Sequence, residues 1–146
     1  MVLFTYNPNF SARHLPVVIF RSISKLNNVI EGGCFCGAVR YSFEFNNYPS
    51  ANCHCSMCRR ISGAAFVSWM AIPRNCFKYT KGDPKKLISS SHGARYFCHE
   101  CATPMVCVLD EDQKNTYITI CSLDEPQEFE PKGDIYVEDM LDWVKK

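Results

Sequence analysis

Hydrophobic and polar side chains alternate most regularly between residues 38 and 45. Four large apolar residues lie two positions apart there, with polar residues in between, and they are Val39, Tyr41, Phe43 and Phe45. Successive side chains of an extended chain point to opposite faces, so this period of two is typical of a strand with one buried face. The pattern predicts a strand that contributes its apolar face to the core.

Shorter apolar runs follow along the rest of the chain. Residues 64–72 are mostly bulky and apolar without alternation, which predicts a strand buried on both faces. The other candidate strands lie at residues 75–80, 86–90, 94–97, 104–109 and 116–120. Glycine, proline and acidic residues separate these runs, as turns do. Short strands at regular intervals predict a mainly β fold of antiparallel sheets with short helices.

Two segments carry helical signals. Residues 59–63 read as a short helical turn that ends at a glycine. Residues 137–146 place apolar side chains at a spacing of three to four, which predicts a short closing helix.

The composition is that of a globular protein, with 47% hydrophobic and 21% charged residues among 146. The length suits one domain, and no repeat or linker divides it. We therefore predict a domain over residues 31–146, preceded by an extension over residues 1–30. The formal net charge of +1 provides no strongly basic surface, so we expect no nucleic-acid partner. No apolar run approaches the length of a membrane span, so we expect no membrane partner.

Residues 1–30 resemble a mitochondrial presequence in composition. They contain Arg13, Arg21 and Lys25 with several serines, and the first acidic residue is Glu31. Our preferred interpretation is an ordinary extension of a cytoplasmic protein, and the alternative is a mitochondrial protein whose presequence is this segment.

Seven of the ten cysteines form three tight clusters: Cys34 and Cys36; Cys53, Cys55 and Cys58; and Cys98 and Cys101. Disulfides are the alternative to metal binding, but cysteines two residues apart cannot easily bridge each other, and no secretory signal is evident. The spacing therefore favours metal ligation in a reducing compartment. Seven sulfurs suit one tetrahedral zinc site with four ligands and a second with three, which keeps one position open.

Spacing alone permits two ways of dividing the sulfurs. In one, a single four-cysteine site uses Cys55, Cys58, Cys98 and Cys101. In the other, Cys34 and Cys36 join Cys98 and Cys101 in a closed site, and the second cluster binds an ion by itself. The second division leaves no clustered cysteine unused.

The same segments resemble a known family. Gly32–Tyr41, Cys53–Arg60 and Arg95–Cys101 are similar, in order and separation, to the glutathione-dependent formaldehyde-activating enzyme family. That family includes the centromere protein V domain and has the Mss4-like, or β-tent, fold. The resemblance extends from about Gly32 to about Leu123, and it implies this zinc fold for the chain.

The resemblance also implies the roles of the cysteines. Cys34, Cys36, Cys98 and Cys101 would hold a structural zinc ion, and Cys53, Cys55 and Cys58 a catalytic one. The implied activity is that of a carbon–sulfur lyase, in which glutathione and formaldehyde, or a related small aldehyde, form S-(hydroxymethyl)glutathione. Three anionic sulfurs leave the ion modestly Lewis acidic, so capture of the thiolate is the expected role. The oligomeric state is left open.

Four residues after the second cluster are candidates for substrate binding. Arg59 and Arg60 could pair with the carboxylates of glutathione, or offset the charge of the metal thiolates. Ser62 and Gly63 could line the pocket, or simply cap the helical turn. Arg95 is weighed in the same way, with structure preferred. His54 and His99 lie between metal cysteines and are expected in supporting or exposed roles.

The chain departs from the family pattern at two positions. Ala102 stands where the family usually has glycine, and Asp134 where it tends to have histidine before an isoleucine. Both changes leave the zinc ligands intact but affect the expected substrate pocket.

Two other functions compete with the lyase. The first is a non-catalytic zinc-binding interaction module of the centromere protein V type. The second is a methionine sulfoxide reductase, which would need a nucleophilic cysteine outside the metal sites. Cys76, Cys107 and Cys121 lie in apolar runs, and we expect them in the core.

Overall fold

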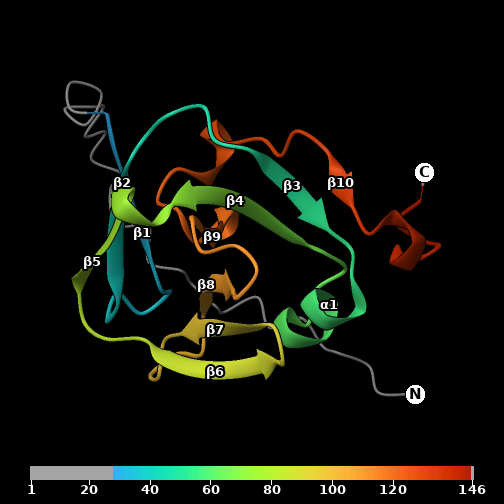
Figure 1. Ribbon diagram of the computed structural model, residues 1–146, viewed down its shortest axis with the longest axis horizontal. Coiled ribbons are helices and arrows are strands. Elements are labelled where there is room, and N and C mark those ends of the chain that lie inside the picture. Colours follow the sequence, from blue (N-terminus) through green and yellow to red (C-terminus); the bar gives the residue numbers. More distant parts are fainter. Residues whose placement is uncertain (1–27, 146) are drawn as a thin grey trace, which may run out of the picture.

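Two β-sheets make up residues 28–145, the part of the chain described by the computed structural model (Figure 1). The smaller sheet has the order β1-β2-β5 and the larger one β10-β3-β4-β9-β8-β7-β6. The smaller sheet contains β1 (Val29–Gly33), β2 (Arg40–Glu44) and β5 (Phe77–Lys81). The larger contains β3 (Ser50–Cys53), β4 (Val67–Pro73), β6 (Lys85–Ser90), β7 (Gly93–Phe97), β8 (Pro104–Leu109), β9 (Asn115–Thr119) and β10 (Asp134–Ile135). The predicted mainly β fold is confirmed, and β10 alone among the described strands pairs in parallel, with β3.

One α-helix, α1 (Ser56–Ser62), occurs within residues 28–145. It ends where Gly63 adopts the left-handed conformation at φ 65°, which a glycine reaches without steric cost. The predicted helical turn is thus confirmed, although the helix starts three residues earlier than expected. Four 3₁₀ turns complete the described elements: η2 (Arg74–Cys76), η3 (Ile120–Ser122), η4 (Pro126–Glu128) and η5 (Val137–Asp139).

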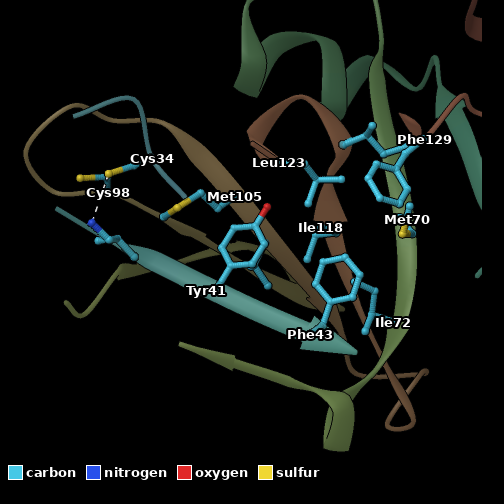
Figure 2. Close-up of a cluster of buried hydrophobic side chains, with 13 residues drawn as sticks. Cys34, Tyr41, Phe43, Met70, Ile72, Cys98, Met105, Ile118, Leu123 and Phe129 are labelled. Carbon is cyan, nitrogen blue, oxygen red and sulfur yellow. Dashed lines mark hydrogen bonds between the residues drawn. The ribbon is translucent and has the colours of Figure 1, made fainter. Parts of the chain in front are cut away.

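The hydrophobic core lies between the two sheets (Figure 2). Tyr41 and Phe43 project from β2 and are at most 1% exposed. They pack in one cluster with Met70 and Ile72 from β4 and Ile118 from β9. Full burial of one such side chain stabilises the fold by about 1.5–3 kcal/mol. The alternation in residues 38–45 therefore predicted the core face of β2 correctly.

Strand β4 is less buried than its sequence indicates. Met70 and Ile72 are buried, whereas Val67 and Trp69 are only half-buried. The first pair faces the core, and the second pair lies under α1 beside a small cavity. A seven-residue helix covers only part of this face, so the prediction of burial on both faces is wrong.

The predicted closing helix does not form. After β10, Tyr136 takes a left-handed conformation at φ 55°, and the chain continues through the short turn η5. Beyond it Met140 and Leu141 are only half-buried, and Trp143 is 75% exposed. Short helices depend on tertiary packing for their stability, so helical spacing alone was insufficient.

Strands β1, β3 and β10 were not anticipated. Two glycines weaken the strand signal of β1. Strands β3 and β10 are short and largely polar, so they are defined by their hydrogen bonds to neighbouring strands rather than by a side-chain pattern. β1 begins at Val29, and the domain boundary at residue 31 stays a prediction. Residues 1–27, on which the presequence hypothesis rests, lie outside the described part. No helix within residues 28–145 combines the length and apolar character required to cross a membrane.

Candidate metal centre

Four cysteines meet at one end of the core, where two hairpin connections approach each other. Cys34 and Cys36 lie between β1 and β2, and Cys98 and Cys101 lie between β7 and β8. Figure 2 shows Cys34 and Cys98 beside Met105, at the edge of the buried cluster. The group therefore joins the small sheet to the large one.

Sulfur–sulfur distances in this group fit a tetrahedral metal site. The Sγ atoms of Cys34 and Cys36 are 3.5 Å apart, and those of Cys36 and Cys98 are 3.7 Å apart. Metal–sulfur bonds of about 2.3 Å in a tetrahedron imply edges of about 3.8 Å. A disulfide needs about 2.05 Å, so the same distances exclude that bond here. Soft thiolate donors of this kind suit zinc or another thiophilic ion.

Polar groups around the four-cysteine group favour thiolates. The backbone N–H of Val39 donates to Cys34 Sγ at 3.2 Å. The hydroxyl of Thr103 lies 3.1 Å from Cys101 Sγ, and its hydrogen bond is the main cause of a Cys101 pKa lowered to about 5. Thr103 also accepts the N–H of Phe35 at 3.1 Å, which links the two metal-binding loops directly.

Ala102, the residue after the last cysteine, carries backbone strain. Its φ is +59°, in the left-handed region where a side chain costs about 1–2 kcal/mol. We expect Ala102→Gly to raise the free energy of unfolding by about 1 kcal/mol, because glycine removes this strain. Urea denaturation of the metal-loaded protein measures the change.

Ala51→Gly is the matched control for Ala102→Gly. Ala51 lies in the extended strand β3, where glycine relieves no strain. It increases the conformational entropy of the unfolded chain and should therefore destabilise the protein. Equal losses of stability in the two variants would contradict the strain at Ala102.

The other three cysteines converge where β3 runs into α1. Cys53 ends β3, Cys55 caps the helix, and Cys58 lies in its first turn. Their sulfurs lie within 4.8 Å of one another. The backbone N–H of Cys58 donates to Cys55 Sγ at 3.3 Å. Three sulfur donors satisfy three positions of a tetrahedral ion and leave the fourth for an incoming ligand.

Within this group the pKa values of Cys53 and Cys58 shift in opposite directions. The pKa of Cys58 is lowered to about 5, mainly by a hydrogen bond from Cys53, with further hydrogen bonds from Cys55, Arg95 and Trp69, while burial opposes the change. The pKa of Cys53 is raised, first by its bond to Cys58 and then by burial. Between these two thiols, the arrangement therefore favours the thiolate form at Cys58 over that at Cys53.

Arg95 reaches this group from β7. Its guanidinium donates from Nη2 to Cys58 Sγ at 3.4 Å and from Nη1 to Ser89 Oγ at 2.6 Å. Nη1 also lies 3.3 Å from Met57 Sδ. Beside it is a cavity of about 10 Å³ between α1 and the large sheet, lined in part by Cys58, Ser62 and Trp69. That volume accommodates about one water molecule.

His54 lies between two of the ligating positions but points elsewhere. The side chain is 2% exposed, and its Nε2 is 2.8 Å from Asp134 Oδ1. The pKa of Asp134 is lowered mainly by this contact, and then by the amide of Asn52. The ring of Phe66 lies 5.3 Å away, centroid to centroid, and Nδ1 has no hydrogen-bond partner within residues 28–145. His54 therefore ties the cysteine loop to the C-terminal segment.

The residues predicted to bind substrate lie on or next to α1. Arg59 Nε donates to the carbonyl of His54 at 3.1 Å, and Arg60 is exposed. Ser62 Oγ donates to the carbonyl of Cys58 at 2.8 Å, while Gly63 forms the helix cap. All four are therefore near the three-cysteine group, and two of them also stabilise the helix.

The structure brings together the second of the two sulfur combinations allowed by spacing. Cys55 and Cys58, at the start of α1, group with Cys53, whereas Cys98 and Cys101, in the β7–β8 connection, group with Cys34 and Cys36. Of the remaining cysteines, Cys107 is buried, Cys76 is half-buried and Cys121 is exposed. The prediction that Cys121 belongs to the core is therefore wrong, because η3 turns its side chain outward while burying its neighbours.

Sequence reasoning missed the partners of these cysteines. Arg95 was noticed but not assigned to Cys58, and Asp134, noticed as a departure from the family pattern, was not assigned to His54 beside the cysteines. Thr103 follows Cys101 by two residues, and that proximity was the only local signal.

Comparisons with known proteins concern the family and the fold. A family model described as "Glutathione-dependent formaldehyde-activating enzyme" matches residues 29–139, more than half of the chain. No curated protein matches significantly. Among solved structures, the crystal structure of a Rhodobacter sphaeroides protein is similar at a TM-score of 0.60 and 20% identity, over 72% of this chain and 99% of that one. At this identity the likeness concerns the fold.

Proposed function

Because the chain belongs to the glutathione-dependent formaldehyde-activating enzyme family, we propose that it is a zinc-dependent carbon–sulfur lyase that condenses glutathione with formaldehyde or a related small aldehyde. The observation that carries the proposal is the separation of seven sulfurs into a closed group of four and an open group of three. A purely structural protein needs only the first kind.

The donor sets of both groups fit zinc. All seven candidate ligands are cysteines, and the sulfur spacing at the closed group matches a tetrahedral ion. A zinc ion held by Cys53, Cys55 and Cys58 would stabilise a bound thiolate at neutral pH and polarise an aldehyde oxygen. No change of oxidation state is needed: the glutathione thiol gives its proton to water, its sulfur attacks the aldehyde carbon as the C=O π bond opens, and the resulting oxygen takes a proton back from water.

Residues of the chain would position the substrate around the open group. The guanidinium end of Arg59 and the exposed Arg60 are proposed to bind the glutathione carboxylates by charge-assisted hydrogen bonds. Ser62 and Gly63, at the end of α1, would border the bound tripeptide beside the small cavity. Cys55, half-buried at the helix cap, would leave the open position accessible from solvent.

The test combines metal analysis with a direct assay. Protein purified without chelator is expected to contain about two zinc ions per chain, as the two groups require. Exchange NMR of mixed glutathione and formaldehyde should show S-(hydroxymethyl)glutathione forming faster in proportion to enzyme concentration. The spontaneous reaction is the baseline, and protein stripped of metal is the control.

An absence of acceleration at every enzyme concentration would contradict the enzymatic proposal. Two bound zinc ions without acceleration would instead favour the non-catalytic interaction module. A Cys53→Ser protein separates the two, since an interaction module would keep its protein partners.

A further inference from the structure

Arg95 is a buried cation without a carboxylate partner. Its side chain lies on the face of the large sheet that α1 covers, and the residue is 8% exposed. None of the ion pairs within residues 28–145 involves it. A charge removed from water is costly unless an opposite charge compensates it. Some other negative group must therefore balance this guanidinium.

The sulfur of Cys58 is the group in the right place. Of the three side-chain atoms that the guanidinium contacts, the Ser89 hydroxyl and the Met57 thioether are neutral. Cys58 Sγ, 3.4 Å from Nη2, is the one that becomes an anion when the three-cysteine group binds a metal ion. The positive charge of Arg95 is therefore balanced by the negative charge of the metal-bound cysteine group.

The guanidinium is fixed in this position. Ser89 Oγ accepts from Nη1 and donates to the carbonyl of Gly93, so the hydroxyl is held by both strands of the β6–β7 hairpin. β7 pairs with β6 on one side and β8 on the other, which anchors the backbone of Arg95 within the sheet. Such a preformed cation needs no rearrangement when the charge of the site changes.

Arg95 changes the net charge of the metal-loaded three-cysteine site. Three thiolates on a divalent ion have one net negative charge, which Arg95 balances. An added neutral ligand would leave the site neutral, while an added thiolate would leave one negative charge instead of two. Coulomb repulsion against an anionic fourth ligand is thereby reduced in a partly buried site, where screening by water is weak.

Resting on the proposed function, we infer that Arg95 is a positioning residue that allows the three-cysteine site to accept an anionic thiolate as its fourth ligand. Its positive charge, rather than its bulk, gives the site this preference. The ligand class is a deprotonated thiol, whether or not it carries carboxylates.

Ligand titrations of the cobalt-loaded protein test this inference without any aldehyde. Cobalt(II) in both groups gives a visible spectrum that changes when the open site gains a ligand. The probes are 2-mercaptoethanol, a thiol without carboxylates, and imidazole, a neutral ligand. For Arg95→Gln we expect thiol affinity to fall by roughly ten- to a hundred-fold, because the site then carries one more negative charge that repels the thiolate, with imidazole affinity unchanged. Arg95→Lys, which keeps the charge, should recover much of the thiol affinity.

Two further variants complete the design. Lys78→Gln removes a positive charge from an exposed position on β5 and should leave both affinities unchanged. Ser89→Ala frees the guanidinium without removing it and should weaken thiol binding by about three-fold, so the inference stays testable if Arg95→Gln does not fold.

Equal loss of both ligands in Arg95→Gln would overturn the inference, because it would indicate general damage to the site. Unchanged thiol affinity in that variant would overturn it as well, while the proposed function would stand. A wild-type protein that binds no thiol at all would overturn the proposed function, and the inference with it.

Discussion

A Cys58→Ser variant is expected to lose nearly all of the proposed lyase activity while keeping its fold. Serine supplies a hard hydroxyl that stays protonated at neutral pH, so the open site loses one of its three anionic ligands. Removing an outer partner of a metal ligand already costs about 10–100-fold, so loss of a ligand itself should exceed about 100-fold. The zinc content should fall from about two to about one per chain, because the four-cysteine group is untouched. Metal analysis and the NMR assay measure both quantities.

Cys121→Ser is the matched control for this variant. Cys121 is exposed and belongs to neither group, so its activity, zinc content and melting temperature should equal those of the wild type. A Cys58→Ser protein that retained two zinc ions and full turnover would show that the three-cysteine group is not the reactive site.

A Cys98→Ser variant is expected to fail in the opposite way, by losing stability. Cys98 is fully buried at the end of the core, and its group connects the β1–β2 hairpin to the β7–β8 hairpin. Structural zinc contributes folding free energy directly, on the order of 10 kcal/mol in isolated zinc-finger peptides. Even a loss of about 3 kcal/mol would lower the melting temperature by about 10 °C or more in a chain of this size. Calorimetry of wild type and variant measures it.

Cys107→Ser separates the loss of metal from the cost of a buried hydroxyl. Cys107 is buried as well, but it lies outside both groups. Its replacement should cost about 1–3 kcal/mol, the penalty for burying a hydroxyl without a full set of hydrogen bonds. If Cys98→Ser were no less stable than Cys107→Ser, and a chelator did not lower the melting temperature of the wild type, the four-cysteine group would not stabilise the fold.

The sequence alone predicted those parts of the fold that depend on local spacing. The alternation around Tyr41 identified the buried face of β2, since that face is determined by neighbours two residues apart. Local spacing failed at the C-terminus, where the spacing of Val137 and Met140 is helical but the chain forms only the short turn η5 and Val137 stays exposed. β3 and β10 escaped prediction because their pairing with other strands, and not their side chains, defines them.

In the candidate site, too, the sequence predicted the features that depend on local spacing and missed those that depend on distant residues. The cysteines themselves were found by sequence, because a metal ligand is recognised by residue type and close spacing. The groups around them were not, since Arg95 comes to Cys58 from 37 residues away and Asp134 to His54 from 80. Neither contact follows any periodicity.

By itself, the sequence determined which seven cysteines are candidate ligands, a mainly β fold and the core face of β2, because each depends on residues close together in the chain. The tertiary structure decided which clusters come together, since sheet pairing brings Cys36 Sγ within 3.7 Å of Cys98 Sγ across 62 residues. It also decided that a buried arginine faces the open group. Both outcomes depend on how strands associate, and strand association depends on the packing of the whole chain.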